Sequence, residues 1–156
     1  MPNLALKRTI QAPVAEVWAS WNDYGNIDKF NPNLNRSFLI DNNGQTGLGA
    51  TRQCDFSDGK NYIQERIVEY VPEKKMAVDI YHGTVPLKKA KATIEMRPIG
   101  RGQTELAFHM DFTPGMGLLG RLMAPMMKAQ FRKALGKLVD ANKAYVEDGI
   151  VIARAA

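Results

Sequence analysis

The chain has 156 residues, of which 45% are hydrophobic and 24% charged, and its formal net charge at pH 7 is +5. This composition is ordinary for a globular protein, and the absence of any apolar run of about 18 residues excludes a transmembrane helix. The N-terminus lacks the order of charged and apolar residues that marks a secretory signal. We therefore expect one cytoplasmic domain over residues 1–156.

The positive charge is not concentrated in one segment. Lysines and arginines are spread over the chain, often beside acids as in Glu73-Lys74-Lys75, and no nucleic-acid-binding module accompanies them. A solvated basic surface is expected, with no nucleic-acid partner. The single cysteine, Cys54, cannot form an internal disulfide and has no metal-site spacing around it.

The first part of the chain predicts one strand and two short helices. Residues 4–10 alternate apolar and polar side chains, and Pro13 then opens a helix with Val14, Val17, Trp18 and Trp21 on one side. After a turn cluster at 23–26, residues 27–30 predict a second, shorter helical piece.

Turn signals then recur at the spacing of hairpins. Strands are predicted over 34–40, 50–56, 62–70, 76–82, 89–97 and 103–112, with turns at 41–44, 57–60 and 99–102. No helix separates these six strands, so the predicted sheet is antiparallel with about seven strands.

The segment 116–148 is the longest periodic stretch. Its apolar residues follow the spacing of one helical face, from Leu119 to Val146, and Gly149 is the predicted stop. Pro125 cannot donate a backbone hydrogen bond, so we expect a short helix up to Met123 and a kink or new start at Pro125. The whole pattern predicts an α+β fold in which a curled sheet closes on the last helix and leaves an interior cavity.

Several segments together resemble a known family. They are IQAPVAEVW followed by WNDYGNIDKFNP, the hairpin GLGATRQCDFSDGKNYIQERIVEYVPEKK, the segment VPLKKAKATIEMRPIGRGQTELAFHMDFTPG and the closing GLLGRLMAPMMKAQFRKALGKL. This set is similar to the polyketide cyclase/dehydrase group of the SRPBCC superfamily, which has the START-like, birch-pollen-allergen-like helix-grip fold. The resemblance implies a cavity for lipids, polyketides, plant hormones or other apolar molecules, and in some members a cyclase or aromatase activity.

The chain departs from the family pattern in places. The family usually has Trp where Phe30 stands and often His where Asn31 stands. The gate and latch sequences of the plant abscisic-acid receptor branch are also absent, which argues against hormone signalling.

Strand register determines which side chains face the cavity. In residues 89–97 the alternation turns Ala90, Ala92, Ile94 and Met96 to one face, so Ala92 and Ile94 are predicted to contact ligand. For the other strands the resemblance implies the inward residues, namely Arg52, Cys54, Ile63, Glu65, Ile67, Asp79, Tyr81, Ala107 and His109.

The inward residues include candidates for proton transfer. His109 is the leading one, because an imidazole near Asp111 or a substrate carbonyl acts as acid or base near pH 7. Glu65 with Asp79 forms a second candidate, since burial raises the pKa of a carboxyl group. The alternatives are a structural strand histidine, a carboxylate neutralised by Arg52, and strand carboxylates that simply face solvent.

The last helix supplies an adaptable apolar surface. Met123, Met126 and Met127 have unbranched side chains that fit ligands of different shapes, and Gln130 adds a polar contact. Ordinary core packing of the methionines is the alternative. Two histidines and one cysteine are too few for a metal site, and the glycines 115, 117 and 120 do not follow a nucleotide-binding spacing. No metal or cofactor is expected.

Three functions fit this pattern. The first is a binding or carrier protein that encloses a small hydrophobic or amphipathic molecule, as a monomer or weak homodimer. The second is a polyketide cyclase or aromatase-type enzyme that uses the same cavity. The third is a lipid exchanger at a membrane surface, which would use Lys128, Arg132, Lys133 and Lys137.

Overall fold

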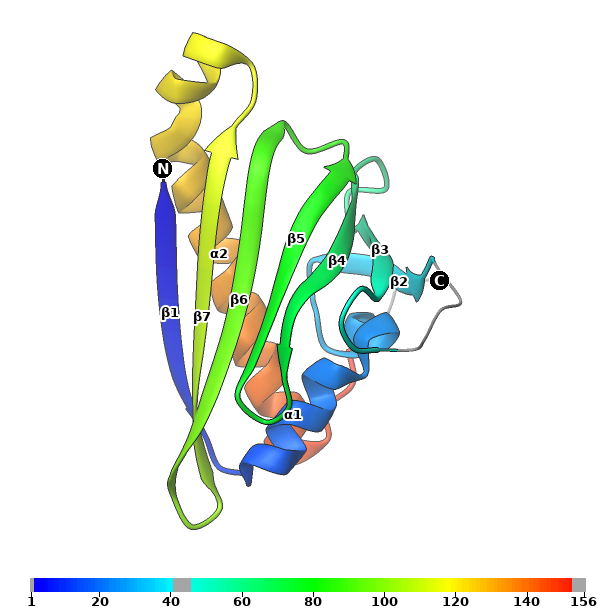
Figure 1. The fold of residues 1–156 in the computed structure, drawn as a ribbon, viewed down its shortest axis with the longest axis vertical. Coiled ribbons are helices and arrows are strands. Elements are labelled where there is room, and N and C mark those ends of the chain that lie inside the picture. Colours follow the sequence, from blue (N-terminus) through cyan, green and yellow to red (C-terminus); the bar gives the residue numbers. More distant parts are fainter. Residues whose placement is uncertain (1, 41–45, 153–156) are drawn as a thin grey trace.

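The computed structural model describes residues 2–40 and 46–152, which form seven strands and three helices (Figure 1). In chain order the elements are β1 (Asn3–Ile10), α1 (Val14–Asn22), the 3-10 helix η1 (Tyr24–Lys29), β2 (Leu34–Leu39), β3 (Thr51–Phe56), β4 (Tyr62–Val71), β5 (Lys75–Gly83), β6 (Leu87–Gly100), β7 (Gln103–Pro114) and α2 (Gly117–Asp148). The predicted order of one strand, two short helices, six strands and a long helix is confirmed. The predicted turn at 41–44 lies outside the described residues.

All seven strands form one antiparallel sheet in the order β1-β7-β6-β5-β4-β3-β2. Strands β2 to β7 run as a meander, and β1 pairs with β7 at the opposite edge. The first strand of the chain therefore lies beside the last, which places both next to the helix that follows β7.

Helix α2 covers one face of the sheet, which we call the inner face (Figure 1). The strands bury alternate residues against it, as β6 does with Ala90, Ala92, Ile94 and Met96. The face turned away from α2 is the outer face, and it carries mostly polar side chains. A curved antiparallel sheet closed by one long C-terminal helix is the predicted helix-grip arrangement.

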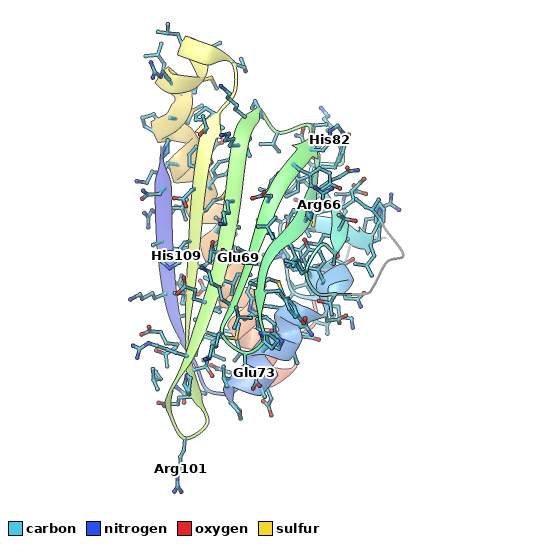
Figure 2. The ribbon with its side chains drawn as sticks, viewed as in Figure 1. Arg66, Glu69, Glu73, His82, Arg101 and His109 are labelled. Carbon is cyan, nitrogen blue, oxygen red and sulfur yellow. The ribbon has the colours of Figure 1, made fainter. Side chains whose placement is uncertain are left out.

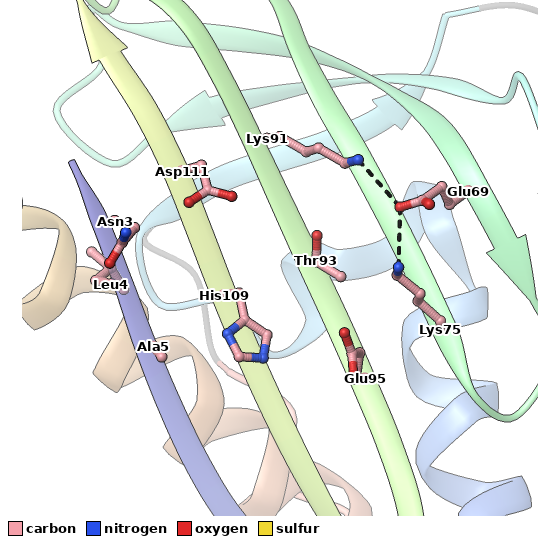
Figure 3. A pocket seen from close by; sticks show the side chains of 10 residues that line it. All are labelled: Asn3, Leu4, Ala5, Glu69, Lys75, Lys91, Thr93, Glu95, His109 and Asp111. Atoms are coloured by element: carbon pink, nitrogen blue, oxygen red, sulfur yellow. Dashed lines mark ion pairs between the residues drawn. The ribbon is translucent and has the colours of Figure 1, made fainter. Parts of the chain in front are cut away.

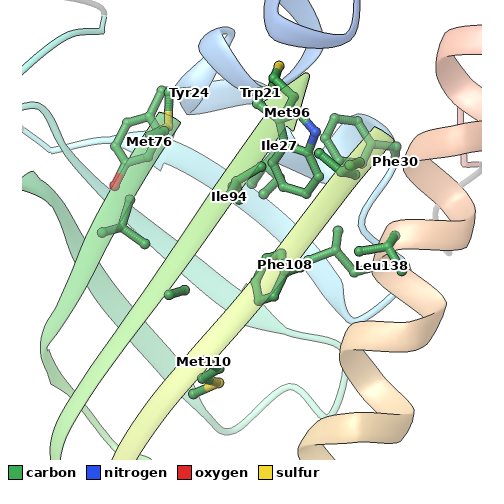
Figure 4. Packing of buried hydrophobic residues seen from close by; sticks show 14 of the residues in the cluster. Trp21, Tyr24, Ile27, Phe30, Met76, Ile94, Met96, Phe108, Met110 and Leu138 are labelled. Carbon is green, nitrogen blue, oxygen red and sulfur yellow. The ribbon is translucent and has the colours of Figure 1, made fainter. Parts of the chain in front are cut away.

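The two short helices close one end of the space between sheet and α2. Trp21 of α1 packs edge-on against Phe30, with ring centroids 5.3 Å apart, and its Nε1 donates a hydrogen bond to Asn142 Oδ1 at 3.1 Å. Asn142 Nδ2 in turn donates to Ser20 Oγ at 2.9 Å. These buried polar contacts join α1 to α2 (the surrounding apolar packing is drawn in Figure 4).

Helix α2 is continuous across Pro125, so the predicted break is wrong. Pro125 is exposed, and so is Arg121, whose carbonyl loses its helical hydrogen-bond donor. Water satisfies such a carbonyl, which removes the main reason to end the helix there. Gly149 caps the C-terminus in the left-handed region, at φ 67°, as predicted. No helix among residues 2–40 and 46–152 is long and apolar enough to cross a membrane.

The start of α2 depends on a glycine. A Cβ placed on Gly120 would lie 1.7 Å from the carbonyl oxygen of Gly115, so Gly120→Ala forces the first turn away from the end of β7. We expect a loss of about 1–3 kcal/mol in the free energy of unfolding, measured by urea denaturation.

Gly136 is the matched control on the same helix. A Cβ there meets only Arg8 Nη2, at 3.9 Å. Gly136→Ala should raise the free energy of unfolding by about 0.5–1 kcal/mol, because alanine loses less backbone entropy in a helix. Equal effects of the two substitutions would contradict the close packing at Gly120.

Candidate functional site

A cavity of about 440 Å³ lies between the inner face of the sheet and α2. A volume in this range accommodates a drug-sized ligand. The wall is mostly apolar and draws on every strand except β1. Its apolar side chains are Trp21, Ile27, Leu34, Cys54, Phe56, Ile63, Val78, Ile80, Val85, Leu87, Ala92, Ile94, Phe108, Met110, Phe131, Ala134, Leu135 and Leu138.

Strand β6 leaves room at the centre of the sheet by presenting a small residue. Ala92 of β6 pairs with Val78 of β5 and Met110 of β7, and all three point to the inner face. Because the methyl group of Ala92 lies between two larger side chains, a hollow remains between it and α2. The space therefore follows from the pattern of side-chain sizes along β6.

One part of the wall carries a buried ion pair. Arg52 donates from Nη2 to Glu65 Oε2 at 2.6 Å and from Nε to the same oxygen at 3.2 Å. The two residues pair directly across β3 and β4, and their side chains are only 6% and 9% exposed. Glu65 Oε1 receives no hydrogen bond from the described residues, so a carboxylate oxygen is available at the cavity wall.

The guanidinium of Arg52 has further partners in η1. Nη1 donates to the carbonyl oxygen of Tyr24 at 3.1 Å, and Cζ lies 3.9 Å from the centroid of the Tyr24 ring. Burial lowers the pKa of Arg52, but the charge of Glu65 and the contact with Tyr24 outweigh it and raise that pKa above the ordinary value. Arg52 therefore stays charged inside the protein.

Burial also controls the nearby weak acids. It raises the pKa of the Tyr24 hydroxyl, which has no hydrogen-bond partner among the described residues, and Arg52 opposes the shift. Burial and the charge of Glu65 raise the pKa of the Cys54 thiol, again against Arg52. Both groups are neutral at physiological pH, so neither is a nucleophile, and of the two only Cys54 lines the cavity.

The polar side chains at the mouth come from the β3–β4 turn and from α2. They include Ser57, Asp58, Asn61 and Gln130. Asp58 Oδ1 accepts from the backbone N–H groups of Lys60 and Asn61, each at 2.8 Å. These bonds lower the pKa of Asp58, led by the one from Asn61, and they hold the turn at the rim.

Five of the residues proposed from the sequence line this cavity. Arg52 and Glu65 form the ion pair, Ala92 and Ile94 lie in the centre of the sheet, and Gln130 lies at the mouth. The inward orientation of Cys54, Ile63 and Ile67 is also as predicted, because all three are buried.

The predicted inward orientation of His109 is wrong. His109 pairs with Thr93 of β6 and Ala5 of β1, so it lies on the outer face, while its neighbours Phe108 and Met110 face the cavity. Figure 2 shows it on the side of the sheet away from α2. There it lines a separate polar hollow that also contains Glu95 (Figure 3). An acid or base for chemistry inside the cavity does not come from His109.

Asp79 and Tyr81 also lie on the outer face, contrary to expectation. In the strand register Asp79 lies opposite Arg66 of β4 and Lys91 of β6. Tyr81 is 41% exposed, and the guanidinium carbon of Arg66 lies 4.4 Å from the centroid of its ring. The inward residues of β5 are Val78 and Ile80. Glu65 therefore has no second carboxylate beside it from β5.

The three methionines of α2 do not line the cavity. Met127 is buried in the core, Met123 packs partly against that core, and Met126 is 50% exposed. The predicted ligand contacts of these side chains are therefore not supported. The part of α2 that faces the cavity is one to two turns further along, at Phe131, Ala134 and Leu135.

Cys54 offers a test of the closed wall. Because its side chain is 2% exposed and its pKa is raised, Cys54 should not react with Ellman's reagent in the native protein and should react after unfolding. Ser57→Cys, in a Cys54→Ala background, is the positive control, since Ser57 is exposed at the rim. Rapid native labelling of Cys54 would contradict the described packing of β3.

Comparisons with known proteins agree with this architecture. The family model for polyketide cyclase/dehydrase and lipid transport matches residues 1–147. A search of the curated proteins finds no match.

Three solved structures illustrate the likeness in fold. A START superfamily protein from Mycobacterium smegmatis is 16% identical, with a TM-score of 0.77 over 93% of this chain and 97% of that one. The protein XoxI from Bacillus cereus is 16% identical, with a TM-score of 0.78 over 95% and 97%. The Zhui aromatase/cyclase from Streptomyces sp. R1128 is 13% identical, with a TM-score of 0.80 over 94% and 93%. Together with the family match, the helix-grip fold identifies the chain as a member of the polyketide cyclase/dehydrase and lipid transport family.

Proposed function

We propose that the protein binds a small, mainly apolar molecule in the cavity between the sheet and α2, and acts as a carrier or binding protein. The observation that supports this most strongly is the cavity itself. It has a volume of about 440 Å³ and a predominantly apolar wall that includes Phe108, Met110 and Leu135. Burying the apolar surface of a ligand there is favourable by about 25 cal/mol per Å².

The ion pair suggests one polar group on the ligand. Glu65 Oε1 has no donor from the described residues, so a ligand hydroxyl at that point donates a hydrogen bond to a carboxylate. A ligand with an apolar body and one hydroxyl, as in many lipids and polyketides, therefore fits better than a pure hydrocarbon. Ligands with a carboxylate are disfavoured, because the facing oxygen is itself negative.

A cyclase or aromatase activity is the alternative, and within this cavity it depends on Glu65. Glu65 is held in an ion pair with Arg52 through Oε2, so its other oxygen, Oε1, is placed to accept a hydrogen bond from a ligand. We therefore favour binding over catalysis.

The test is a titration with the neutral fluorescent probe N-phenylnaphthylamine. A saturable rise in emission with one site per chain is expected, and apolar alcohols should displace the probe. The absence of uptake would overturn the proposal. A linear polyketone that is bound and then converted, with conversion abolished in Glu65→Gln, would support the enzyme instead.

A further inference from the structure

Helix α2 carries a second apolar face at its N-terminal end. Four side chains form it, and we call them the outer stripe: Leu118, Leu119, Leu122 and Met126, all at least half exposed. Leu118 and Leu122 are 77% and 76% exposed, which is high for leucine. At about 100° per residue Leu118 and Leu122 lie on the side of the helix opposite the buried Gly120, and Leu119 and Met126 lie beside Leu122.

The outer stripe lies at a projecting end of the molecule. The first turns of α2 extend past the ends of β1 and β7, so no strand lies over them (Figure 1). At about 1.5 Å per residue the stripe is about 12 Å long from Leu118 to Met126. One further turn leads to Gln130 at the mouth of the cavity, so a partner on the stripe is also close to the mouth.

The surroundings of the stripe are strongly basic. Residues 112–139 contain no aspartate or glutamate, and residues 80–94 contain none either. The second segment includes the start of β6, which lies beside the start of α2. The cations in these two segments are Lys88, Lys89, Lys91, Arg121, Lys128, Arg132, Lys133 and Lys137. Of these, only Lys91 forms an ion pair with a described residue, on the outer face with Glu69.

We infer that the outer stripe docks onto an anionic lipid surface, with Leu118, Leu119, Leu122 and Met126 in the interfacial layer and the neighbouring cations among the head groups. An exposed apolar helical face bordered by lysine and arginine is the arrangement that binds such an interface. Both contributions raise the affinity for the lipid surface. Burial of the leucines removes apolar surface from water, and each cation near the head groups adds about fivefold in affinity.

A second copy of the chain fits the stripe less well. In a symmetric dimer the same patch faces itself, so Arg121 and Lys133 of two copies would approach each other. Like charges brought together across an interface oppose association. An anionic bilayer instead satisfies both the apolar stripe and its basic border.

Co-sedimentation with vesicles tests the inference. The protein should bind vesicles of equal parts phosphatidylcholine and phosphatidylglycerol, bind those of phosphatidylcholine alone at least about tenfold more weakly, and be released by salt. Leu118→Ser with Leu122→Ser should weaken binding at least about tenfold. Leu48→Ser, at a leucine that is 72% exposed in the β2–β3 connection, is the matched control and should bind as the wild type does.

Charge variants and a local probe complete the test. Arg121→Glu with Lys133→Glu should weaken vesicle binding at least about tenfold, while Lys74→Glu in the β4–β5 turn should change it little. The emission of Leu122→Trp should shift to the blue on mixed vesicles. Unchanged binding of Leu118→Ser with Leu122→Ser, or no binding to the mixed vesicles at low salt, overturns the inference. The inference is also overturned if sedimentation equilibrium shows that the wild type is a dimer and that Leu118→Ser with Leu122→Ser is a monomer.

The inference does not require the cavity to hold a ligand. N-phenylnaphthylamine uptake is measured without vesicles, and Leu118→Ser with Leu122→Ser should leave it unchanged. A protein that binds mixed vesicles but takes up no probe would overturn the proposed carrier function and leave the docking surface standing.

Discussion

Replacing Arg52 by methionine is expected to lower the free energy of unfolding by about 3–5 kcal/mol, measured by urea denaturation at neutral pH. The substitution keeps most of the side-chain volume but leaves Glu65 buried without the two hydrogen bonds that reach its Oε2. An unpaired carboxylate in the protein interior is strongly unfavourable. The contact with the Tyr24 ring is lost as well.

The double variant Arg52→Met with Glu65→Leu separates the charge effect from packing. It should recover most of the lost stability, because replacing both members of a buried pair by apolar residues is often nearly neutral. Arg97→Met breaks the Arg97–Glu105 pair on the outer face and should leave the urea midpoint unchanged, since Arg97 is 68% exposed. If Arg52→Met were equally harmless, the ion pair would not be buried as described.

Replacing Ala92 by phenylalanine should weaken binding of N-phenylnaphthylamine by about a hundredfold or more while the protein stays folded. Ala92 lies in the middle of the inner face between Val78 and Met110, and its methyl group borders the cavity. A phenyl ring there occupies the space proposed for the ligand. Because the ring enters a hollow rather than a packed core, the free energy of unfolding should change little or rise by about 0.5–2 kcal/mol.

Ala5→Phe is the matched control for this substitution. Ala5 is an exposed alanine of β1 on the outer face, beside His109. The same change in size there should leave probe binding unaffected. Equal loss of binding in both variants, or none in Ala92→Phe, would show that the probe binds elsewhere on the protein.

The fold could be predicted because its local signals agree with each other. Proline and glycine mark the turns, strands alternate between them, and one long amphipathic segment follows the last strand. Pro125 misled the prediction, since a proline is tolerated in a helix where the freed carbonyl meets water. The exposed stripe shares Leu119, Leu122 and Met126 with the single apolar face predicted for this helix, because periodicity alone does not tell which side of a helix the sheet covers.

The sequence predicts the site only in part, because the family resemblance and the alternation of apolar side chains indicate opposite faces for β5 and β7. On β7 the side chains Leu106, Phe108, Met110 and Phe112 are all strongly apolar, which places His109 on the opposite face. On β5 the same reasoning with Val78 and Ile80 turns Asp79 outward. Arg52 with Glu65 was identified as a possible neutralised pair, but their direct opposition in β3 and β4 depends on strand register.

Methionine methyl NMR distinguishes a ligand site in the space between the sheet and α2 from binding elsewhere on the protein. Met110 lines the cavity, whereas Met116 and Met126 are exposed at the start of α2. On titration with N-phenylnaphthylamine, the Met110 methyl resonance should shift and saturate at one equivalent while those of Met116 and Met126 stay in place. Shifts at Met116 and Met126 with none at Met110 would contradict the account.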